Sequence, residues 1–166
     1  MAKTSYAIAL GSNRRHGTHG APAAILRAAL GALEAKGVEV ERVSAIRATP
    51  ALGPAGRGFA NAAAIVWSDL DPPGLLALLK RTERAFGRRA GRRWGPRVLD
   101  LDIILWSEGP WGGSGLIIPH PEFRRRGFVL DPVSEIAPDW RDPLSGLAMR
   151  QLRARAMRPQ GAREPI

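Results

Sequence analysis

The sequence of 166 residues contains no cysteine and no long run of apolar residues. The absence of cysteine excludes disulfide bonds, thiolate metal sites and a cysteine nucleophile. A membrane-spanning helix needs about 18 consecutive apolar residues, and the sequence has no such run. Residues 1–5 also lack the regions typical of a signal peptide. These absences favour a cytoplasmic protein with no membrane partner. The length suits a single domain over residues 1–158, with a frayed tail at 159–166.

Lysine and aromatic residues are scarce, whereas arginine is abundant. Lysine occurs only at positions 3, 36 and 80, and aromatic residues make up 6% of the chain. The net charge of +10 is therefore carried mainly by arginine, which suits bidentate contacts with phosphate. Such an excess favours an anionic partner, either a nucleotide or a nucleic acid. Compositional drift towards arginine contributes as well, but the clusters at 88–97 and 124–126 are dense enough to indicate a function.

Several phosphate-binding and catalytic motifs are missing. The chain has no Gly-x-x-x-x-Gly-Lys-Ser/Thr loop, no His-Glu-x-x-His and no Gly-x-Ser-x-Gly. Residues 11–13, Gly-Ser-Asn, are typical of a turn after a strand over 6–10, and no lysine follows them. A triphosphate bound by this chain would therefore be held by arginine side chains and a metal ion.

The apolar periodicity predicts alternating strands and helices. Strands are expected at 6–10, 38–46, 62–68, 97–105 and 116–118, and helices at 22–36, 72–86, 128–136 and 144–157. Asp71 is the expected N-cap of the second helix, and loops rich in proline and glycine are expected at 47–61 and 107–115. This order favours an α/β (α+β) fold with a ferredoxin-like βαββαβ core. Its sheet would be mostly antiparallel, with helices on one face, a site on the free face, and C-terminal additions.

The segment from Val98 to Asp102 is typical of a buried strand that carries two carboxylates. Side chains alternate between the faces of a strand, so Asp100 and Asp102 share one face, about 7 Å apart, while Leu99 and Leu101 point to the core. Two like charges this close repel each other, and a divalent cation such as Mg²⁺ removes the repulsion. The alternative is a hairpin end whose two aspartates face water.

The loop before this strand favours the metal. Five arginines lie within residues 88–97, at positions 88, 89, 92, 93 and 97. A complex of Mg²⁺ with a polyphosphate needs such a cationic loop next to a carboxylate pair. A solvated charged surface would look the same if the loop were considered alone.

Two further segments suit a planar heterocycle. The amide of Asn61 presents a donor beside an acceptor, which fits the edge of a pterin or purine, and Phe59 would stack on its face. His120 on a proline-flanked arm, and Phe128 after the arginines at 124–126, would approach the same site from another direction. A turn residue at 61 and a structural histidine at 120 are the simpler alternatives.

Five motifs occur together in a characteristic order. They are Ala-Leu-Gly-Ser-Asn at 9–13, Thr-Pro-Ala-Leu-Gly-Pro at 49–54, Phe-Ala-Asn-Ala at 59–62, Arg-Trp-Gly-Pro-Arg-Val-Leu-Asp-Leu-Asp at 93–102, and Ile-Pro-His-Pro at 118–121 with Arg-Gly-Phe-Val-Leu at 126–130. Over roughly residues 5–140 the chain resembles the 6-hydroxymethyl-7,8-dihydropterin pyrophosphokinases of folate biosynthesis. The resemblance implies a ferredoxin-like fold. It also implies transfer of the β,γ-diphosphate of ATP to the pterin hydroxymethyl group, with release of AMP.

The same resemblance implies roles for individual residues. Asp100 and Asp102 would hold two Mg²⁺ ions, and Arg88 and Arg97 would act on the phosphates of ATP as catalytic residues. The implied pterin pocket consists of Thr49, Pro50, Leu52, Phe59, Asn61 and Phe128. The implied nucleotide-binding residues are Glu83, Arg88, Arg93, Trp94, Arg97, Ile103, His120 and Arg126.

Two other functions fit parts of the sequence. A basic ferredoxin-like domain would bind RNA by stacking bases on aromatic residues of its sheet, but here the candidate aromatics fall in expected loops. The aspartate pair would also repel RNA. A nucleotidyltransferase would use the same pair but would attach AMP to its substrate instead of releasing it. The pyrophosphokinase interpretation predicts small-molecule substrates, no nucleic acid partner, and a monomer.

Overall fold

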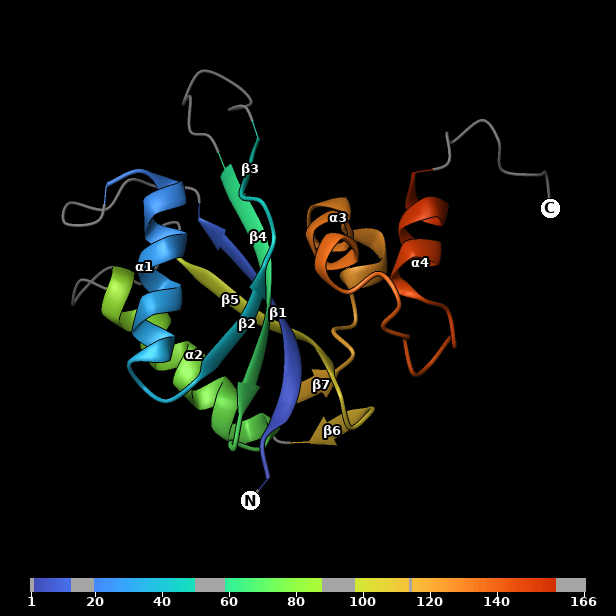
Figure 1. Cartoon of the computed structure of the whole chain (residues 1–166), viewed down its shortest axis with the longest axis horizontal. Helices are drawn as coiled ribbons and strands as arrows, with labels where there is room; N and C mark the ends of the chain where they lie inside the picture. Colours follow the sequence, from blue (N-terminus) through green and yellow to red (C-terminus); the bar gives the residue numbers. More distant parts are fainter. Residues whose placement is uncertain (1, 13–19, 50–58, 88–97, 114, 158–166) are drawn as a thin grey trace.

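The computed structural model describes residues 2–12, 20–49, 59–87, 98–113 and 115–157. In these ranges the main sheet has the strands β1 (Thr4–Ser12), β2 (Glu39–Val43), β3 (Arg47–Thr49), β4 (Phe59–Ser68) and β5 (Asp100–Trp106). Its order is β2-β4-β1-β5, β3 also pairs with β4, and all of these pairs are antiparallel (Figure 1). With one helix before β2 and another before β5, this is the expected ferredoxin-like core.

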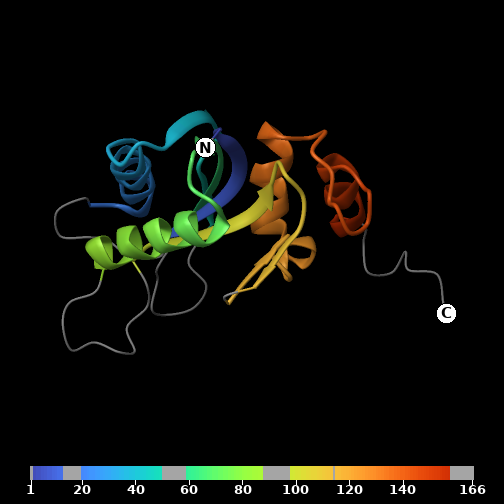
Figure 2. The ribbon, with the colours of Figure 1, turned by 90° about the horizontal axis from the view of Figure 1, so that it is seen from below.

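Helices α1 (Pro22–Glu34) and α2 (Pro72–Gly87) cover one face of this sheet (Figure 2). Proline at the first position and the sequence around Asp71 fix where they begin. The Asp71 carboxylate accepts a hydrogen bond from the Gly74 N–H at 2.9 Å, which confirms the expected N-cap. Gly37, with a φ of 92°, follows α1 in the left-handed conformation that glycine adopts easily. None of the described helices is long and apolar enough to cross a membrane.

The larger core lies between these helices and the sheet. It takes Tyr6, Ile8 and Leu10 from β1, and Leu101 and Ile103 from β5. The apolar stripes of α1 and α2 pack against these side chains, and Leu99, just before β5, is buried with them. The alternation expected around the aspartate pair is therefore confirmed, because its leucines face the core and its carboxylates face the opposite side of the sheet.

A second, smaller core lies on that opposite side. The helices α3 (Gly127–Ile136) and α4 (Met149–Ala156) and the short 3₁₀ helix η1 (Phe123–Arg125) pack there against β1, β4 and β5. A register shift between β1 and β5 turns both Ile104 and Leu105 towards these helices. The expectation of a free sheet face is therefore wrong for this half of the face. The rest, at the end of β1, stays open.

Other boundaries differ from the expected ones. β1 continues through Ser12, so the expected turn at Gly11 is wrong, and β3 occupies the start of the expected loop at 47–61. A two-stranded sheet of β6 (Trp111–Gly113) and β7 (Leu116–Ile118) occupies part of the expected turn at 107–115. α4 begins at Met149 instead of 144, because the residues before it form a turn in which the Asp142 N–H donates to the Leu147 carbonyl at 2.9 Å.

Candidate active site

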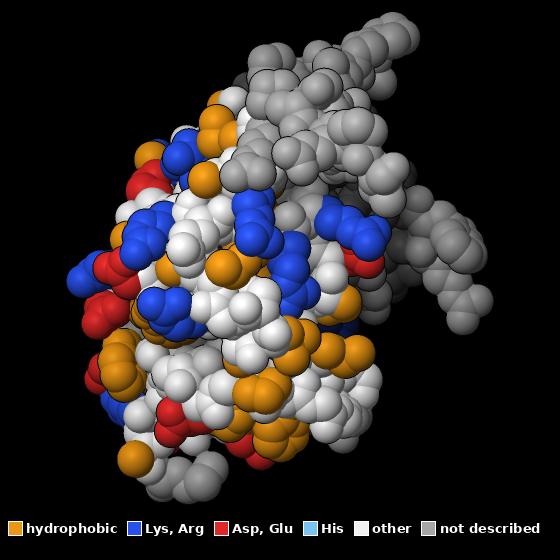
Figure 3. Space-filling view, turned by 90° about the vertical axis from the view of Figure 1, so that its right-hand side faces the viewer, with side chains coloured by type: hydrophobic (Ala, Val, Ile, Leu, Met, Phe, Trp, Pro, Cys, Tyr) orange, Lys and Arg blue, Asp and Glu red, His pale blue; other side chains and the backbone are white. Residues whose placement is uncertain are grey.

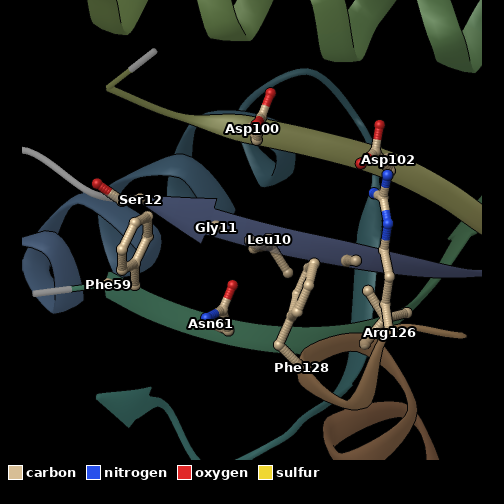
Figure 4. Close-up of a pocket in the computed structure, with 11 residues that line it drawn as sticks. Leu10, Gly11, Ser12, Phe59, Asn61, Asp100, Asp102, Arg126 and Phe128 are labelled. Carbon is tan, nitrogen blue, oxygen red and sulfur yellow. The ribbon is translucent and has the colours of Figure 1, made fainter. Parts of the chain in front are cut away.

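The register of the sheet brings a carboxylate and an amide to either side of one glycine. Gly11 on β1 pairs with Asp100 on β5 and with Asn61 on β4. Two residues earlier on β1, Ala9 pairs with Asp102. Because alternate residues of a strand share a face, all these side chains lie on the open part of the sheet (Figure 4).

A pocket of about 500 Å³ opens on this surface. The sheet forms its floor, and the start of α3 forms one wall (Figure 4). Its lining mixes small, aromatic and charged side chains: Ala9, Leu10, Gly11, Ser12, Phe59, Asn61, Asp100, Asp102, Arg126, Phe128 and Val129. Such a pocket suits a planar ligand with one polar edge and a charged substituent.

The two carboxylates stand at one edge of the pocket. Asp100 is exposed and Asp102 is half-buried. In the part of the chain that the structure describes, no group of three or more histidine, cysteine, aspartate or glutamate residues could hold a metal ion. Two carboxylates are nevertheless a donor set that fits Mg²⁺, because Mg²⁺ usually binds one or two carboxylates together with substrate phosphates and water.

The arm between β7 and α3 carries the basic residues His120 and Arg126, of which Arg126 lines the pocket and His120 does not. The His120 N–H donates to the Ile104 carbonyl at 3.0 Å, which fixes the arm against β5. Nδ1 of His120 accepts from the Glu122 N–H at 3.1 Å, so the proton of the neutral ring is on Nε2. Burial lowers the pKa of His120, in part opposed by the nearby charge of Asp102, so the neutral ring is favoured. The guanidinium of Arg126 points towards Asp102 (Figure 4).

Two phenylalanines face the pocket from different elements. Phe59 comes from β4 and Phe128 from α3, and both are unusually open for large apolar side chains, with exposed fractions of 44% and 52%. Asn61 lies between them on the floor (Figure 4). The side-chain amide of Asn61 makes no hydrogen bond to any described residue. Both the Oδ1 acceptor and the Nδ2 donor of this side chain are therefore available to a ligand.

Glu83 and Ile103 do not line the pocket. The Glu83 carboxylate accepts a hydrogen bond from the Leu101 N–H at 2.8 Å and pairs with Lys80 at 3.1 Å. Glu83 thus ties α2 to β5 between the two aspartates. The side chain of Ile103 is buried in the core, so only its backbone can meet a ligand, at the outer edge of β5.

The remaining residues singled out in the sequence lie at the edge of the described chain or outside it. Thr49 ends β3 and pairs with Phe59 on β4. Outside the described residues lie Pro50 and Leu52 of the implied pterin pocket, and Arg88, Arg93, Trp94 and Arg97 of the implied nucleotide site. Their roles stay predictions.

Gly11 is the most informative of the pocket-lining residues that sequence reasoning missed; the others are Ala9, Leu10, Ser12 and Val129. Gly11 reads as part of a turn, whereas it lies within β1 on the floor of the pocket. A Cβ atom at this position would come within 3.2 Å of Oδ1 of Asn61. A glycine close to the end of an apolar strand often marks a close backbone approach, and this signal could have identified it.

Comparison with known proteins identifies the family. The family model described as 7,8-dihydro-6-hydroxymethylpterin-pyrophosphokinase matches residues 7–138. The chain belongs to this family. The matched residues include both aspartates, Asn61, both phenylalanines and the arm with His120 and Arg126.

Individual members of the pyrophosphokinase family agree with this assignment. A 2-amino-4-hydroxy-6-hydroxymethyldihydropteridine pyrophosphokinase from Synechocystis is 44% identical over 116 residues, which is 70% of this chain and 60% of the relative. The protein of the same name from Methylorubrum extorquens is 40% identical over 134 residues, covering 80% of this chain and 82% of the relative. Among solved structures, Plasmodium falciparum HPPK-DHPS covers 92% of this chain with a TM-score of 0.68 and 13% identity, which shows the same fold. This chain spans 41% of that longer one.

Proposed function

We propose that this chain transfers the β,γ-diphosphate of ATP to 6-hydroxymethyl-7,8-dihydropterin in folate biosynthesis, giving the pterin diphosphate and AMP. The observation that carries the proposal is a single pocket that joins an aromatic and amide site to a carboxylate pair on the same sheet face. A pterin and a metal-bound polyphosphate need these two half-sites next to each other. Family membership and the names of the relatives support the same reaction.

The pterin would lie between the two phenylalanine rings, above Gly11. Stacking on Phe59 and Phe128 suits a flat bicyclic ring, and the free amide of Asn61 offers the donor and acceptor that a pterin edge requires. The absence of a side chain on Gly11 leaves room for the ring on the sheet. In this pose the 6-hydroxymethyl group points to Asp100 and Asp102. Thr49, Pro50 and Leu52 are the further pterin-binding residues that we propose.

The phosphates of ATP would lie between the carboxylates and the basic residues. Asp100 and Asp102 would hold two Mg²⁺ ions together with phosphate oxygens. These ions would neutralise the negative charge of the phosphates and lower the pKa of the substrate hydroxyl. Arg126 and the Nε2–H of His120 would donate to phosphate oxygens. Arg88, Arg93, Trp94 and Arg97 from the segment before β5, with Glu83 and the backbone of Ile103, are the proposed nucleotide contacts.

The reaction is a displacement at the β-phosphorus of ATP. The oxygen of the hydroxymethyl group forms a bond to this phosphorus while the bond to the oxygen bridging the α- and β-phosphates breaks. The hydroxyl proton passes to solvent, and AMP leaves with the bridging oxygen. Such transfers depend mainly on positioning and on stabilisation of the charge that develops on the phosphates. No protein base is required if the cation that Asp100 and Asp102 would hold lowers the pKa of the attacking hydroxyl.

We further propose that residues 1–158 act as one pyrophosphokinase domain, as a monomer in the cytoplasm and without a nucleic acid partner. Positive charge on the side of the molecule that bears α4 is interspersed with acidic and apolar side chains (Figure 3). Arg153 there pairs with Asp131 at 2.9 Å, and Arg150 with Asp139 at 3.5 Å. This pairing differs from the continuous basic surface that favours binding of a nucleic acid.

The test is release of AMP by the full chain with ATP, Mg²⁺ and 6-hydroxymethyl-7,8-dihydropterin. We expect AMP only when the pterin is present, and a loss of turnover of about 10³-fold or more in Asp102→Ala, because the charge on the phosphates is then poorly neutralised. The exposed Glu108, remote from the pocket lining, provides the control variant Glu108→Gln, which should behave as wild type. Full activity of Asp102→Ala with an unchanged circular dichroism spectrum would contradict the metal assignment.

A further inference from the structure

We propose that Asp142 is a positioning residue for the pocket: through Arg124 it fixes η1, and thereby the positions of Arg126 and of Phe128 at the start of α3. This inference rests on the proposed function, because it takes the pocket to be the pterin-binding site. Asp142 lies beyond residues 7–138, the part of the chain that the family model matches. It lies in the turn before α4, a segment to which sequence reasoning assigned no role.

Asp142 is completely enclosed and uses both carboxylate oxygens. Its side chain has an exposed fraction of 0%, against 29% for Arg124. Nε and Nη2 of Arg124 donate to Oδ2 and Oδ1 at 2.6 and 2.7 Å, which is a bidentate pair. The Ser145 hydroxyl and the Leu144 N–H donate to the same carboxylate at 2.7 and 3.0 Å. The pair is therefore rigid on the Asp142 side.

The turn that carries Asp142 is itself well fixed. The Gly146 N–H donates to the Asp142 carbonyl at 2.8 Å, and the Met149 N–H donates to the Trp140 carbonyl at 2.9 Å. Met149 and Leu152 of α4 are buried in the second core. Asp142 is thus attached to a rigid part of the molecule, from which it can hold a neighbouring segment in place.

Arg124 connects this turn to the pocket. It lies in η1, two residues before Arg126 and four before Phe128, and both of these line the pocket. Its guanidinium also lies over the ring of the buried Phe123, 4.7 Å from the ring centre. The Arg126 N–H donates to the Phe123 carbonyl at 3.3 Å, and the Arg126 carbonyl accepts from the Leu130 N–H at 2.9 Å. A shift of η1 would therefore move the first turn of α3.

The charge of Asp142 is maintained under all ordinary conditions. Burial alone would raise the pKa of this carboxyl, but the hydrogen bonds from Arg124, Ser145 and Leu144 outweigh it and lower the pKa to about 2. Removal of the charge leaves the guanidinium of Arg124 without its partner, and breaking one side of a buried charged pair is strongly unfavourable. Asp142→Asn is thus the direct variant, because it keeps the shape and removes the charge.

The experiment is ¹⁹F NMR on protein labelled with 4-fluorophenylalanine, which reports on all 4 phenylalanines of the chain. The signal of Phe128 is assigned by its loss in Phe128→Leu. In Asp142→Asn we expect the Phe128 signal to shift or broaden, while that of Phe86, in the core on the other side of the sheet, stays in place. Arg124→Lys should give a smaller change, because one charged hydrogen bond remains, and it decides the question if Asp142→Asn does not fold.

Kinetics on the same variants separates positioning from general stability. At a temperature where circular dichroism shows full folding, Asp142→Asn should raise the KM for the pterin about 10-fold, because the groups that contact it are displaced. Asp139→Asn, whose side chain is 84% exposed in the same segment, should behave as wild type. An unchanged Phe128 signal and pterin KM, or an equally large change at Phe86, would overturn the proposal. If the wild type released no AMP, the proposed function would fail, while the NMR comparison would still decide the role of Asp142.

Discussion

Asn61 is the residue on which the proposed recognition of the pterin depends most directly. Its amide lies on the pocket floor, half-buried and without a hydrogen bond to any described residue. Asn61→Ala removes one donor and one acceptor, worth about 1–3 kcal/mol together when the ligand is desolvated. We expect pterin affinity to fall about 10- to 100-fold and ATP affinity to change less than about twofold. Calorimetric titration with each substrate measures this, and equal losses for both would show that the pocket is misassigned.

We expect Asp142 to make the free energy of unfolding fall at acid pH. Its pKa is about 2 in the folded protein and near 3.9 in an unfolded chain. A lowered folded pKa means that the contribution to stability is complete above about pH 5 and is lost as the pH falls through about 4 to 2. Its full size is about 2.5 kcal/mol.

Urea unfolding at pH 7, 4 and 2.5 measures this contribution. The free energy of unfolding should fall in wild type by about 2 kcal/mol more than in Asp142→Asn, which cannot titrate at this position. Asp139→Asn is again the control and should retain the wild-type dependence, because its carboxylate is exposed. The same pH dependence in Asp142→Asn as in wild type would contradict the bidentate pair.

Residues of the site differ in how far the sequence predicts them. Asp100 and Asp102 follow from alternation along one strand, so a local pattern places them on one face. Their meeting with Asn61 across Gly11 depends on strand register, which one sequence does not specify. The pair of Arg124 and Asp142 joins residues 18 positions apart, through a turn with no helical or strand periodicity.

At the scale of elements, β1 forms the centre of the pocket floor, and at Gly11 no side chain projects from it into the pocket. The Cβ of Gly11→Ala would press on the Asn61 amide at 3.2 Å and occupy the space proposed for the pterin ring. We expect pterin affinity to fall about 10-fold, which corresponds to about 1.4 kcal/mol, by calorimetric titration. Gly31→Ala on α1 is the control: nothing lies within 4 Å of its added methyl group, and pterin affinity should not change. Unchanged affinity in Gly11→Ala would place the ligand elsewhere.

The elements with strong local signals are those that the sequence predicts well. α2 has an N-cap, an early proline and a continuous apolar stripe, and these agree with its observed bounds. β6 was missed because Trp111–Gly113 is short and rich in glycine, so only its pairing with β7 defines it. α4 begins later than expected because Asp142 and Ser145 favour a closed turn over the first turn of a helix.

At the scale of the whole molecule, the two cores on opposite faces of the sheet have different structural roles. The first core, under α1 and α2, holds the strands in register, and the second holds α3 at the edge of the pocket. The C-terminal segment from 139 onwards is part of the second core through Met149 and Leu152. The fold that the family model matches is thus completed by residues outside the match.

Truncation after residue 138 tests this division. Loss of Met149 and Leu152 removes two buried side chains, worth about 1.5–3 kcal/mol each, and exposes the apolar side of α3. We expect a loss of stability of about 3 kcal/mol or more in urea unfolding. A chain ending at residue 158, without the tail at 159–166 that the sequence predicts to be frayed, is the control and should unfold as the full chain does. Equal stability of both truncated chains would contradict the role assigned to α4.

The central claim is that a diphosphate passes to the pterin at the face formed by Asp100 and Asp102. The most direct measurement is ³¹P NMR of a reaction of the full chain with ATP, Mg²⁺ and 6-hydroxymethyl-7,8-dihydropterin. The predicted result is equal growth of the signals of AMP and of a pterin-linked diphosphate, at the expense of ATP. Formation of ADP, or of a pterin carrying the adenylyl group with release of inorganic diphosphate, would contradict the claim.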